Sequence, residues 1–462
     1  MAVFGQAGLG NGVSSRLPVA WEHVRTWLAD GSDNSRAQRA AGSAFLIRVA
    51  SAAVAFLSQP LLARWMGSYE FGIYAYVWTW LTLLGGVIDC GLGTSAQRFI
   101  PEYAERKSLE LLRGFLSGTR WLAVGLSSLA AVVGVIAIKV FETRLDHFLV
   151  LPMYLACLTL PLLGLAAVQD GIARSFNWIG VALLPIYIVR PLAILLLMLA
   201  AYLAGFHASA VIAMTAVVIA TWATAIFQLA VLDRSLRGKI APGAKSYAFG
   251  TWFATSLPIT LSAGFYFLLS YVDVLVLQVF RSPQDVAVYF AAQKMLALVA
   301  FVYFSVSATV AYKFAEYQAA GDRARLAGFF ARSIHWTFWP SLAGVIVLLV
   351  LGHPLLWLFG PEFVQGYPLI GILAVGLLAR AAVGPADRLL TMLGRQKLSA
   401  LVYGAAFACN LLACVTLIPR FGLAGAALST TAALLVESGA LFWLVKRELG
   451  MGVFMWGGRR ET

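Results

Sequence analysis

The chain has 462 residues, of which 61% are hydrophobic and 12% are charged, and its mean hydropathy is +0.82. Soluble domains carry roughly 25% charged residues, so this composition excludes a water-soluble protein. The formal net charge of +13 is spread along the chain, which argues against a nucleic-acid-binding protein. We expect a helical protein that crosses the membrane many times, because a helix satisfies its own backbone hydrogen bonds in lipid.

Twelve apolar runs follow a polar N-terminal tail, which covers residues 1–41 and is expected to hold a short interfacial helix at 21–28. The seventh run is long for one straight crossing, so it should tilt or bend near Pro258. The predicted spans are 43–66, 71–92, 117–139, 147–169, 180–203, 208–232, 250–280, 286–311, 333–352, 363–385, 398–418 and 422–445.

A polar segment divides six spans from six. It predicts a first lobe over 42–232, a linker at 233–249, a second lobe over 250–447 and a tail at 448–462. With the N-terminus inside, the segments on the inner side hold 25 Lys and Arg residues and the opposite loops hold 5. The positive-inside rule therefore places both termini on the cytoplasmic side of the membrane.

The two halves resemble each other in sequence. Tyr74 aligns with Tyr289 at an offset of 215, and Asp170 aligns with Asp387 at 217. RFIPEYAERK at 98–107 aligns with KFAEYQAAGD at 313–322. Because each half has an even number of spans, both copies enter from the same side, which predicts parallel repeats with a cavity between them.

Enzyme motifs are absent from the sequence: it has no phosphate-binding loop, no HExxH and no GxSxG. We therefore expect neither an enzyme nor a bound metal or cofactor. The four cysteines lie in or beside apolar runs, which favours helix packing over disulfides: Cys90, Cys157, Cys409 and Cys414.

Ionisable residues inside the spans are the strongest functional signal. Each central cation costs about 2.5–3.5 kcal/mol in lipid, so such residues should face a watery cavity or one another. An interhelical salt bridge is the structural alternative, and Lys294 with Asp273 is the clearest candidate pair. The cations are Arg48 in span 1, Arg190 in span 5, Lys294 in span 8 and Arg380 in span 10; the acids are Asp273 in span 7 and Glu437 in span 12, with Asp89 near the end of span 2.

The four cations are not repeated in the other half, where the aligned residues are Ala263, Phe407, Thr79 and Leu163. A purely architectural charge would recur in both copies, so this asymmetry favours a cationic cavity for an anionic substrate. Arginine forks suit phosphate oxygens. We therefore predict that all four cations bind substrate, and that Asp273 and Glu437 are candidates for coupling to a proton or cation.

Five strings along residues 42–447 resemble bacterial polysaccharide-precursor flippases (O-antigen and exopolysaccharide type) of the multidrug/oligosaccharidyl-lipid/polysaccharide (MOP) exporter superfamily. They are GSYEFGIYAYVWTW, DCGLGTSAQRFIPEY, DVLVLQVFRSPQDVAVYFAAQK, LLWLFGPEFVQGY and LIPRFGLAGAALST. The resemblance implies a two-lobed helical transporter that flips undecaprenyl-diphosphate-linked oligosaccharides across the inner membrane for surface polysaccharide synthesis. It also implies that cavity cations hold the diphosphate, with Arg48 at a position where the family commonly has one.

Two alternatives remain open. A multidrug exporter of the same superfamily would favour an acidic cavity, and a membrane polymerase or ligase would need a large outer loop. Expected partners are a lipid-linked oligosaccharide, membrane lipid and other polysaccharide-assembly proteins, with no nucleic acid. The sequence leaves open the glycan, the coupling ion, the oligomeric state and whether the buried cations bind substrate or form salt bridges.

Overall fold

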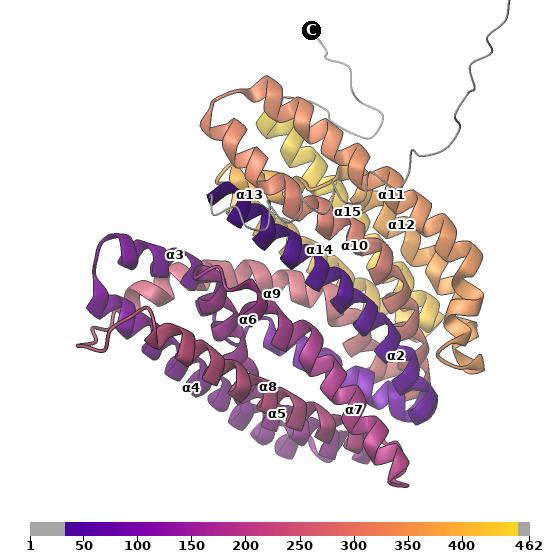
Figure 1. The fold of residues 1–462 in the computed structure, drawn as a ribbon. Helices are drawn as coiled ribbons and strands as arrows, with labels where there is room; N and C mark the ends of the chain where they lie inside the picture. The colour runs from indigo at the N-terminus through magenta and orange to yellow at the C-terminus, as the bar shows by residue number, and fades with distance from the viewer. Residues whose placement is uncertain (1–32, 451–462) are drawn as a thin grey trace, which may run out of the picture.

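A computed structural model describes residues 33–450; the side chains of residues 33–45, Arg48 and Leu449 lie outside that description. The predicted interfacial helix at 21–28 and most of both tails also lie outside the described residues. Over the described range the chain is helical and has no strand. Two lobes are visible in Figure 1, one formed mainly by α3 to α8 and the other mainly by α10 to α15.

The first half contains α2 (Asp33–Gly85), α3 (Leu92–Glu105), α4 (Leu109–Phe141), α5 (His147–Ser175), α6 (Ile179–Leu184), the π-helix η1 (Pro185–Val189), α7 (Arg190–Leu203) and α8 (Ala210–Arg237). The second half contains α9 (Phe249–Phe280), α10 (Pro283–Ala319), α11 (Arg323–Trp357), the 3₁₀-helix η2 (Pro361–Gly366), α12 (Tyr367–Val383), α13 (Ala386–Met392), α14 (Gln396–Phe421) and α15 (Leu423–Leu449).

The predicted spans are confirmed by these helices. Gly67, with φ 74° and ψ 167°, divides α2 into two arms at the positions of the first two spans. Ten further segments of the described chain are long and apolar enough to cross a membrane. The seventh span is one continuous helix that includes Pro258.

The predicted end of span 2 at residue 92 is wrong. The helix stops at Gly85, and a turn follows in which Gly91 has φ 71°. The Asp89 carboxylate accepts hydrogen bonds from the backbone N–H groups of Gly91 (3.1 Å) and Gly93 (2.9 Å). Asp89 therefore stabilises the start of α3, a separate helix that the hydropathy pattern did not predict.

The duplication is visible in the helix order. α4 begins at Leu109 and α11 at Arg323, while α5 begins at His147 and η2 at Pro361; both separations are 214 residues. One difference matters for the site: the fifth span is broken into α6, η1 and α7, whereas its counterpart α14 is a continuous helix.

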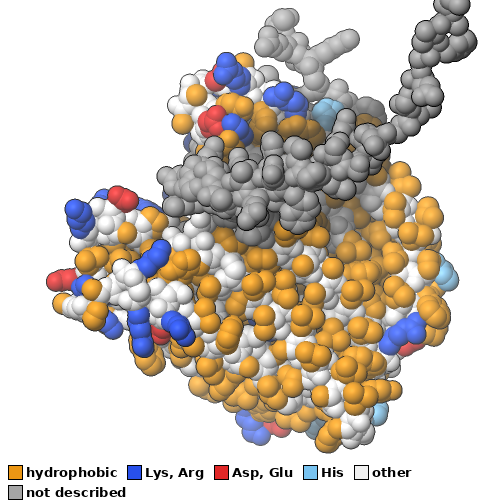
Figure 2. Space-filling view, viewed as in Figure 1, with side chains coloured by type: hydrophobic (Ala, Val, Ile, Leu, Met, Phe, Trp, Pro, Cys, Tyr) orange, Lys and Arg blue, Asp and Glu red, His pale blue; other side chains and the backbone are white. Residues whose placement is uncertain are grey.

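The molecule has two chemically different ends. Most of the Lys and Arg side chains visible in Figure 2 lie where α3 and α13 end the lobes, and hydrophobic side chains cover the broad face between the ends. We call this end the basic end. The other, which holds the α9–α10 turn and η2, is called the closed end.

At the closed end the two halves share one core. Phe71 of α2 contacts the rings of Phe290, Phe359 and Phe363 from the second half, at centroid separations of 6.0–6.3 Å. Backbones also meet there, because a Cβ on Gly72 would lie 1.8 Å from the carbonyl oxygen of Pro283. This close approach fixes the two halves against each other.

At the basic end each half has a core of its own. The first-half core is built from α3, α4, α5, α6 and α8, with Trp252 from the start of α9. The Trp252 Nε1 donates to the Tyr103 hydroxyl at 3.0 Å. The second-half core is built from α10 to α15, around Phe314 and Phe330. The hydrophobic cluster that joins the two halves includes the closed end, whereas the clusters at the basic end are separate, and the ribbons of the two lobes diverge toward that end in Figure 1.

Candidate functional site

The break in the fifth span positions Arg190. Pro185 has no N–H and so leaves the carbonyl of Val181 without its helical donor. Gln228 of α8 supplies that donor, with its Nε2 2.9 Å from the Val181 oxygen. The following turn is a π-helix, in which the Arg190 N–H donates to the Pro185 carbonyl five residues earlier. Such bulges change the direction of the side chains that follow them.

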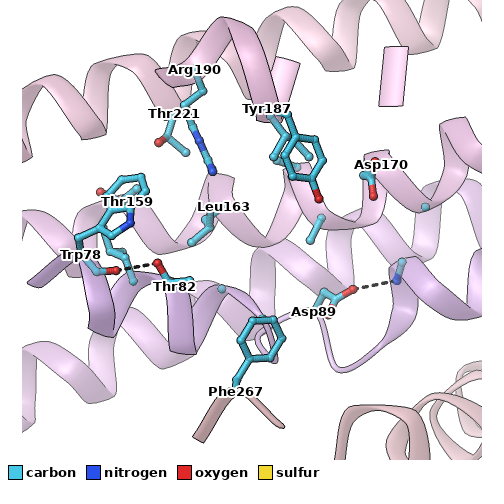
Figure 3. Close-up of a pocket in the computed structure, with 18 of the residues that line it drawn as sticks. Trp78, Thr82, Asp89, Thr159, Leu163, Asp170, Tyr187, Arg190, Thr221 and Phe267 are labelled. Atoms are coloured by element: carbon cyan, nitrogen blue, oxygen red, sulfur yellow. Dashed lines mark hydrogen bonds between the residues drawn. The ribbon is translucent and has the colours of Figure 1, made fainter. Parts of the chain in front are cut away.

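Arg190 reaches a cavity of about 590 Å³ between the two halves. In Figure 3 its guanidinium extends from α7 into this space, and the Tyr187 hydroxyl points into the same space. The opposite wall includes Phe267 and Lys294 of the second half. Polar lining residues are Thr82, Thr94, Gln97, Thr159 and Thr221.

The carboxylates of this cavity are already engaged. Asp89 accepts the two backbone hydrogen bonds that start α3. The Asp170 carboxylate lies 2.8 Å from Nε of Arg174, one helical turn away on α5. Among the described residues neither acid forms an ion pair with Arg190 or Lys294.

Arg190 and Lys294 lack an acidic partner among the described residues, where no ion pair includes either of them. The Arg190 Nε is buried and makes no hydrogen bond to a described residue. The Lys294 ammonium lies 4.5 Å from the centre of the Phe290 ring. A desolvated cation without an acid is costly, so these two charges are available to an anion.

A second cavity, of about 370 Å³, adjoins the first. Both cavities are lined by Arg190, Lys294 and Trp78, which makes these residues the boundary between them. The remaining lining of the second cavity comes mainly from apolar side chains of α2, α7 and α10, together with Phe359 between α11 and η2. Those on the helices are Val49, Ala52, Ala55, Phe56, Leu62, Pro191, Ile194, Ala297, Leu298 and Phe301.

Arg380 and Glu437 lie elsewhere, inside the second half. The Arg380 Nε is 3.3 Å from a Glu437 carboxylate oxygen, and the guanidinium lies 4.6 Å from the centre of the Tyr303 ring. The Tyr303 hydroxyl donates to Asp387 at 2.7 Å. The salt-bridge alternative thus describes the geometry of this pair. The substrate role of Arg380 and the coupling role of Glu437 stay predictions from the sequence, and the diphosphate site proposed below does not include Arg380.

Asp273 is fully buried in a cage of donors. Its carboxylate accepts hydrogen bonds from the Tyr289 hydroxyl (2.6 Å), the Thr430 hydroxyl (2.8 Å) and the Gln293 amide (3.2 Å). The candidate salt bridge between Asp273 and Lys294 is not among the ion pairs of the described side chains. Successive helical residues point about 100° apart, so Gln293 reaches Asp273 while Lys294 faces the cavities.

Arg48 lies in the first arm of α2, but its side chain is outside the described residues. Sequence reasoning missed the engaged pair Asp170 and Arg174 and the hydroxyl of Tyr187 in the cavity wall. The repeat alignment did single out Asp170, and Pro185 and Pro191 are the sequence signal that could have found the break beside Arg190.

The sequence was compared with known families. The model of the polysaccharide biosynthesis protein family matches residues 38–312, and the model of the MatE family matches residues 258–416. No curated protein matches the sequence.

Several solved structures share the fold. One is an inward-facing multidrug-resistance MATE family transporter of the MOP superfamily (TM-score 0.75, 14% identity, 86% of this chain and 94% of that one). Another is the lipid II flippase MurJ in an inward closed conformation (TM-score 0.68, 15% identity, 87% of each chain). A third is a MOP superfamily transporter from Pyrococcus furiosus (TM-score 0.61, 14% identity, 88% and 94%).

These matches cover both halves and agree with the two-lobed helical architecture. The chain belongs to the polysaccharide biosynthesis protein family and has the membrane-spanning fold of the MOP exporter superfamily.

Proposed function

We propose that this protein flips an undecaprenyl-diphosphate-linked oligosaccharide from the cytoplasmic to the periplasmic leaflet of the bacterial inner membrane, for the synthesis of a surface polysaccharide. The observation that carries the proposal is a pair of cations in the cavity between the halves, Arg190 and Lys294, which form no ion pair with an acid of the described residues. A diphosphate offers the charge and the oxygen acceptors that such a pair lacks.

The two ends of the molecule support a direction for this transport. If the basic end faces the cytoplasm, as the positive-inside rule predicts, the described conformation is open to the leaflet in which the substrate is made. Rocking of one half against the other would then open the closed end. Moving a negative headgroup outward gains about 2.3 kcal/mol per charge for each 100 mV of inside-negative potential.

Membrane passage of the headgroup explains why such a cavity is needed. Sugar hydroxyls lose their hydrogen bonds to water in hydrocarbon, which costs several kcal/mol for each unpaired group. The threonine and glutamine side chains of the larger cavity replace part of that hydration. Asp273 and Glu437 remain our candidates for ion coupling, since both carboxylates are fully buried.

Transport in proteoliposomes tests the proposal. Purified protein is reconstituted with a fluorescent lipid-linked oligosaccharide, and flipping is followed by the access of an impermeant quencher. We expect Arg190→Ala and Lys294→Ala to lower the rate at least about tenfold, as loss of one charge-assisted hydrogen bond implies. Arg190→Lys and Lys294→Arg should recover part of it.

The matched control is Arg325→Ala, which removes a positive charge from an exposed side chain at the basic end. It should flip substrate at the wild-type rate. Wild-type rates in both cavity variants would contradict the proposal.

A multidrug exporter is the second candidate, because the MatE family model matches residues 258–416 and the larger cavity also contains the carboxylates of Asp89 and Asp170. The same proteoliposomes distinguish the two. Uptake of a lipophilic organic cation that is unaffected by Arg190→Ala, together with no flipping of the oligosaccharide lipid, would favour drug export.

A further inference from the structure

The two adjoining cavities differ in chemistry on either side of the same cations. Toward α3 and α5 the larger cavity has hydroxyl, amide and carboxylate groups. Toward the first arm of α2 the smaller cavity is mostly apolar. Arg190, Lys294 and Trp78 line both. A polar chamber and an apolar chamber therefore meet at one cationic boundary.

The apolar chamber is built by two helix faces. On α10 the face that begins at Lys294 continues through Ala297, Leu298 and Phe301, at spacings of three, four and seven residues. On α2 the facing wall has Ala52 and Ala55, whose small side chains leave the space open. Residues at these spacings share one side of a helix, so both walls point into the chamber along its length.

We propose that this apolar chamber binds the first isoprene units of the polyprenyl chain, with the diphosphate at Arg190 and Lys294 and the glycan in the larger cavity. The inference rests on the proposed function, because it takes the lipid-linked diphosphate as substrate. In that molecule the diphosphate is covalently placed between a polar glycan and an apolar chain. A site that holds the diphosphate must therefore offer polar space on one side and apolar space on the other.

The size and position of the chamber agree with a partial chain. Its volume of about 370 Å³ is near the lower end of small-ligand pockets, about 300–1,000 Å³, so it holds a few isoprene units and not a whole polyprenyl chain. Val49 lines the chamber and is 41% exposed, so the described side chains around it do not cover it on this side. The rest of the chain leaves at this point for the lipid.

The chamber gives the protein a way to recognise the lipid as well as the headgroup. Apolar burial scales with the number of methylene groups removed from water, so affinity should rise with the first isoprene units. Once the chamber is full, further units remain in lipid and should add little.

Binding of short-chain analogues tests the proposal. Oligosaccharyl diphosphates that carry a methyl group, or one, two or three isoprene units, are titrated into wild-type protein in nanodiscs. We expect the affinity to rise at least about tenfold from the methyl compound to the three-unit compound. Ala297→Phe fills the chamber and should abolish this rise while binding the methyl compound as wild type does.

Two further variants keep the outcome clear. Ala308→Phe adds the same ring on the exposed surface of α10, outside both cavities, and should show the wild-type rise. Ala55→Phe fills the chamber from the opposite wall, in case Ala297→Phe does not fold. The proposal would be overturned if the affinity of wild type did not rise with chain length, or if both chamber variants showed the full wild-type rise.

The same titrations would give a different result if the proposed function itself were wrong. In that case the methyl compound would not bind to wild type, or its affinity would be the same in Arg190→Ala. If the affinity does not rise with chain length but binding of the methyl compound still requires Arg190, the chamber proposal is wrong and the diphosphate site is supported.

Discussion

The two repeat-related hairpins, residues 57–79 and 271–294, share a scaffold but differ in what they bury. Each places a buried tyrosine at the same position, Tyr74 in the first copy and Tyr289 in the second. Tyr289 donates to the Asp273 carboxylate in a closed cage. Tyr74 instead lies beside Gln59 and Arg190 in the wall of the apolar chamber.

This difference separates two kinds of site. Gln59 aligns with Asp273 at an offset of 214. In the second copy the carboxylate takes up the donors around it, so the cage is satisfied from within. In the first copy the aligned side chain is the neutral amide of Gln59. Arg190, whose charge has no acidic partner among the described residues, lines both cavities. We therefore expect anion binding to depend on Arg190 together with Lys294, which the second hairpin directs to the cavities, and stability to depend more on the Asp273 cage.

The largest effect on stability should come from opening the cage. Asp273→Ala leaves the hydroxyls of Tyr289 and Thr430 and the amide of Gln293 without their acceptor. We expect a loss of about 3 kcal/mol in the free energy of unfolding, because unpaired buried polar groups cost about 1–3 kcal/mol each and partly rearrange. Thermal unfolding in nanodiscs measures it. Gln59→Ala is the matched change in the first copy and should cost under about 1 kcal/mol; equal losses would remove the distinction between the hairpins.

A smaller effect is expected where the two hairpins touch. In Gly72→Ala the added Cβ would lie 1.8 Å from the Pro283 carbonyl oxygen, so a backbone must shift. Overpacking of this kind costs about 1–3 kcal/mol. We expect a lower unfolding temperature. We also expect a longer distance between spin labels on Ser68 and Glu362, which double electron–electron resonance spectroscopy measures.

The control for that change is Gly125→Ala on α4, where an added Cβ meets nothing within 4 Å. It should leave the label distance unchanged. An unchanged distance in Gly72→Ala as well would show that this contact does not hold the closed end together.

The smallest effect concerns the helix break that distinguishes the fifth span from α14. Gln228→Leu leaves the Val181 carbonyl without a donor, and we expect a loss of about 1 kcal/mol and weaker binding of the diphosphate through a misplaced Arg190. In a Pro185→Ala background residue 185 regains an N–H that can serve Val181. The penalty of Gln228→Leu should shrink there. A penalty that is the same in both backgrounds would contradict this role for Gln228.

The spans could be predicted because hydropathy records what faces lipid. The predicted and observed helices agree within a few residues at many ends, and differ where glycine geometry decides, as at Gly85 and Gly91. The repeat was also predictable, since three matches between the halves occur in the same order at offsets of 215 to 217.

Charge partners could not be predicted in the same way. Arg380 and Glu437 are 57 residues apart, and their pairing depends on how α12 and α15 are rotated against each other. Lys294 and Asp273 looked like a pair because their helices form a hairpin, yet the neighbouring Gln293 takes that place. Hydropathy contains no information about helix rotation, so only the three-dimensional arrangement showed which cations lack an acidic partner among the described residues.

The most direct test compares Arg190 and Lys294, which have no acidic partner among the described residues, with Arg380, which pairs with Glu437. A soluble methyl-capped oligosaccharyl diphosphate is titrated into wild type, into Arg190→Ala/Lys294→Ala, and into Arg380→Met/Glu437→Met, which replaces the buried pair by apolar side chains. We expect at least about 100-fold weaker binding in the first double variant and a change in affinity of less than about threefold in the second. Binding that survives in the first variant, or is lost in the second, would contradict this prediction.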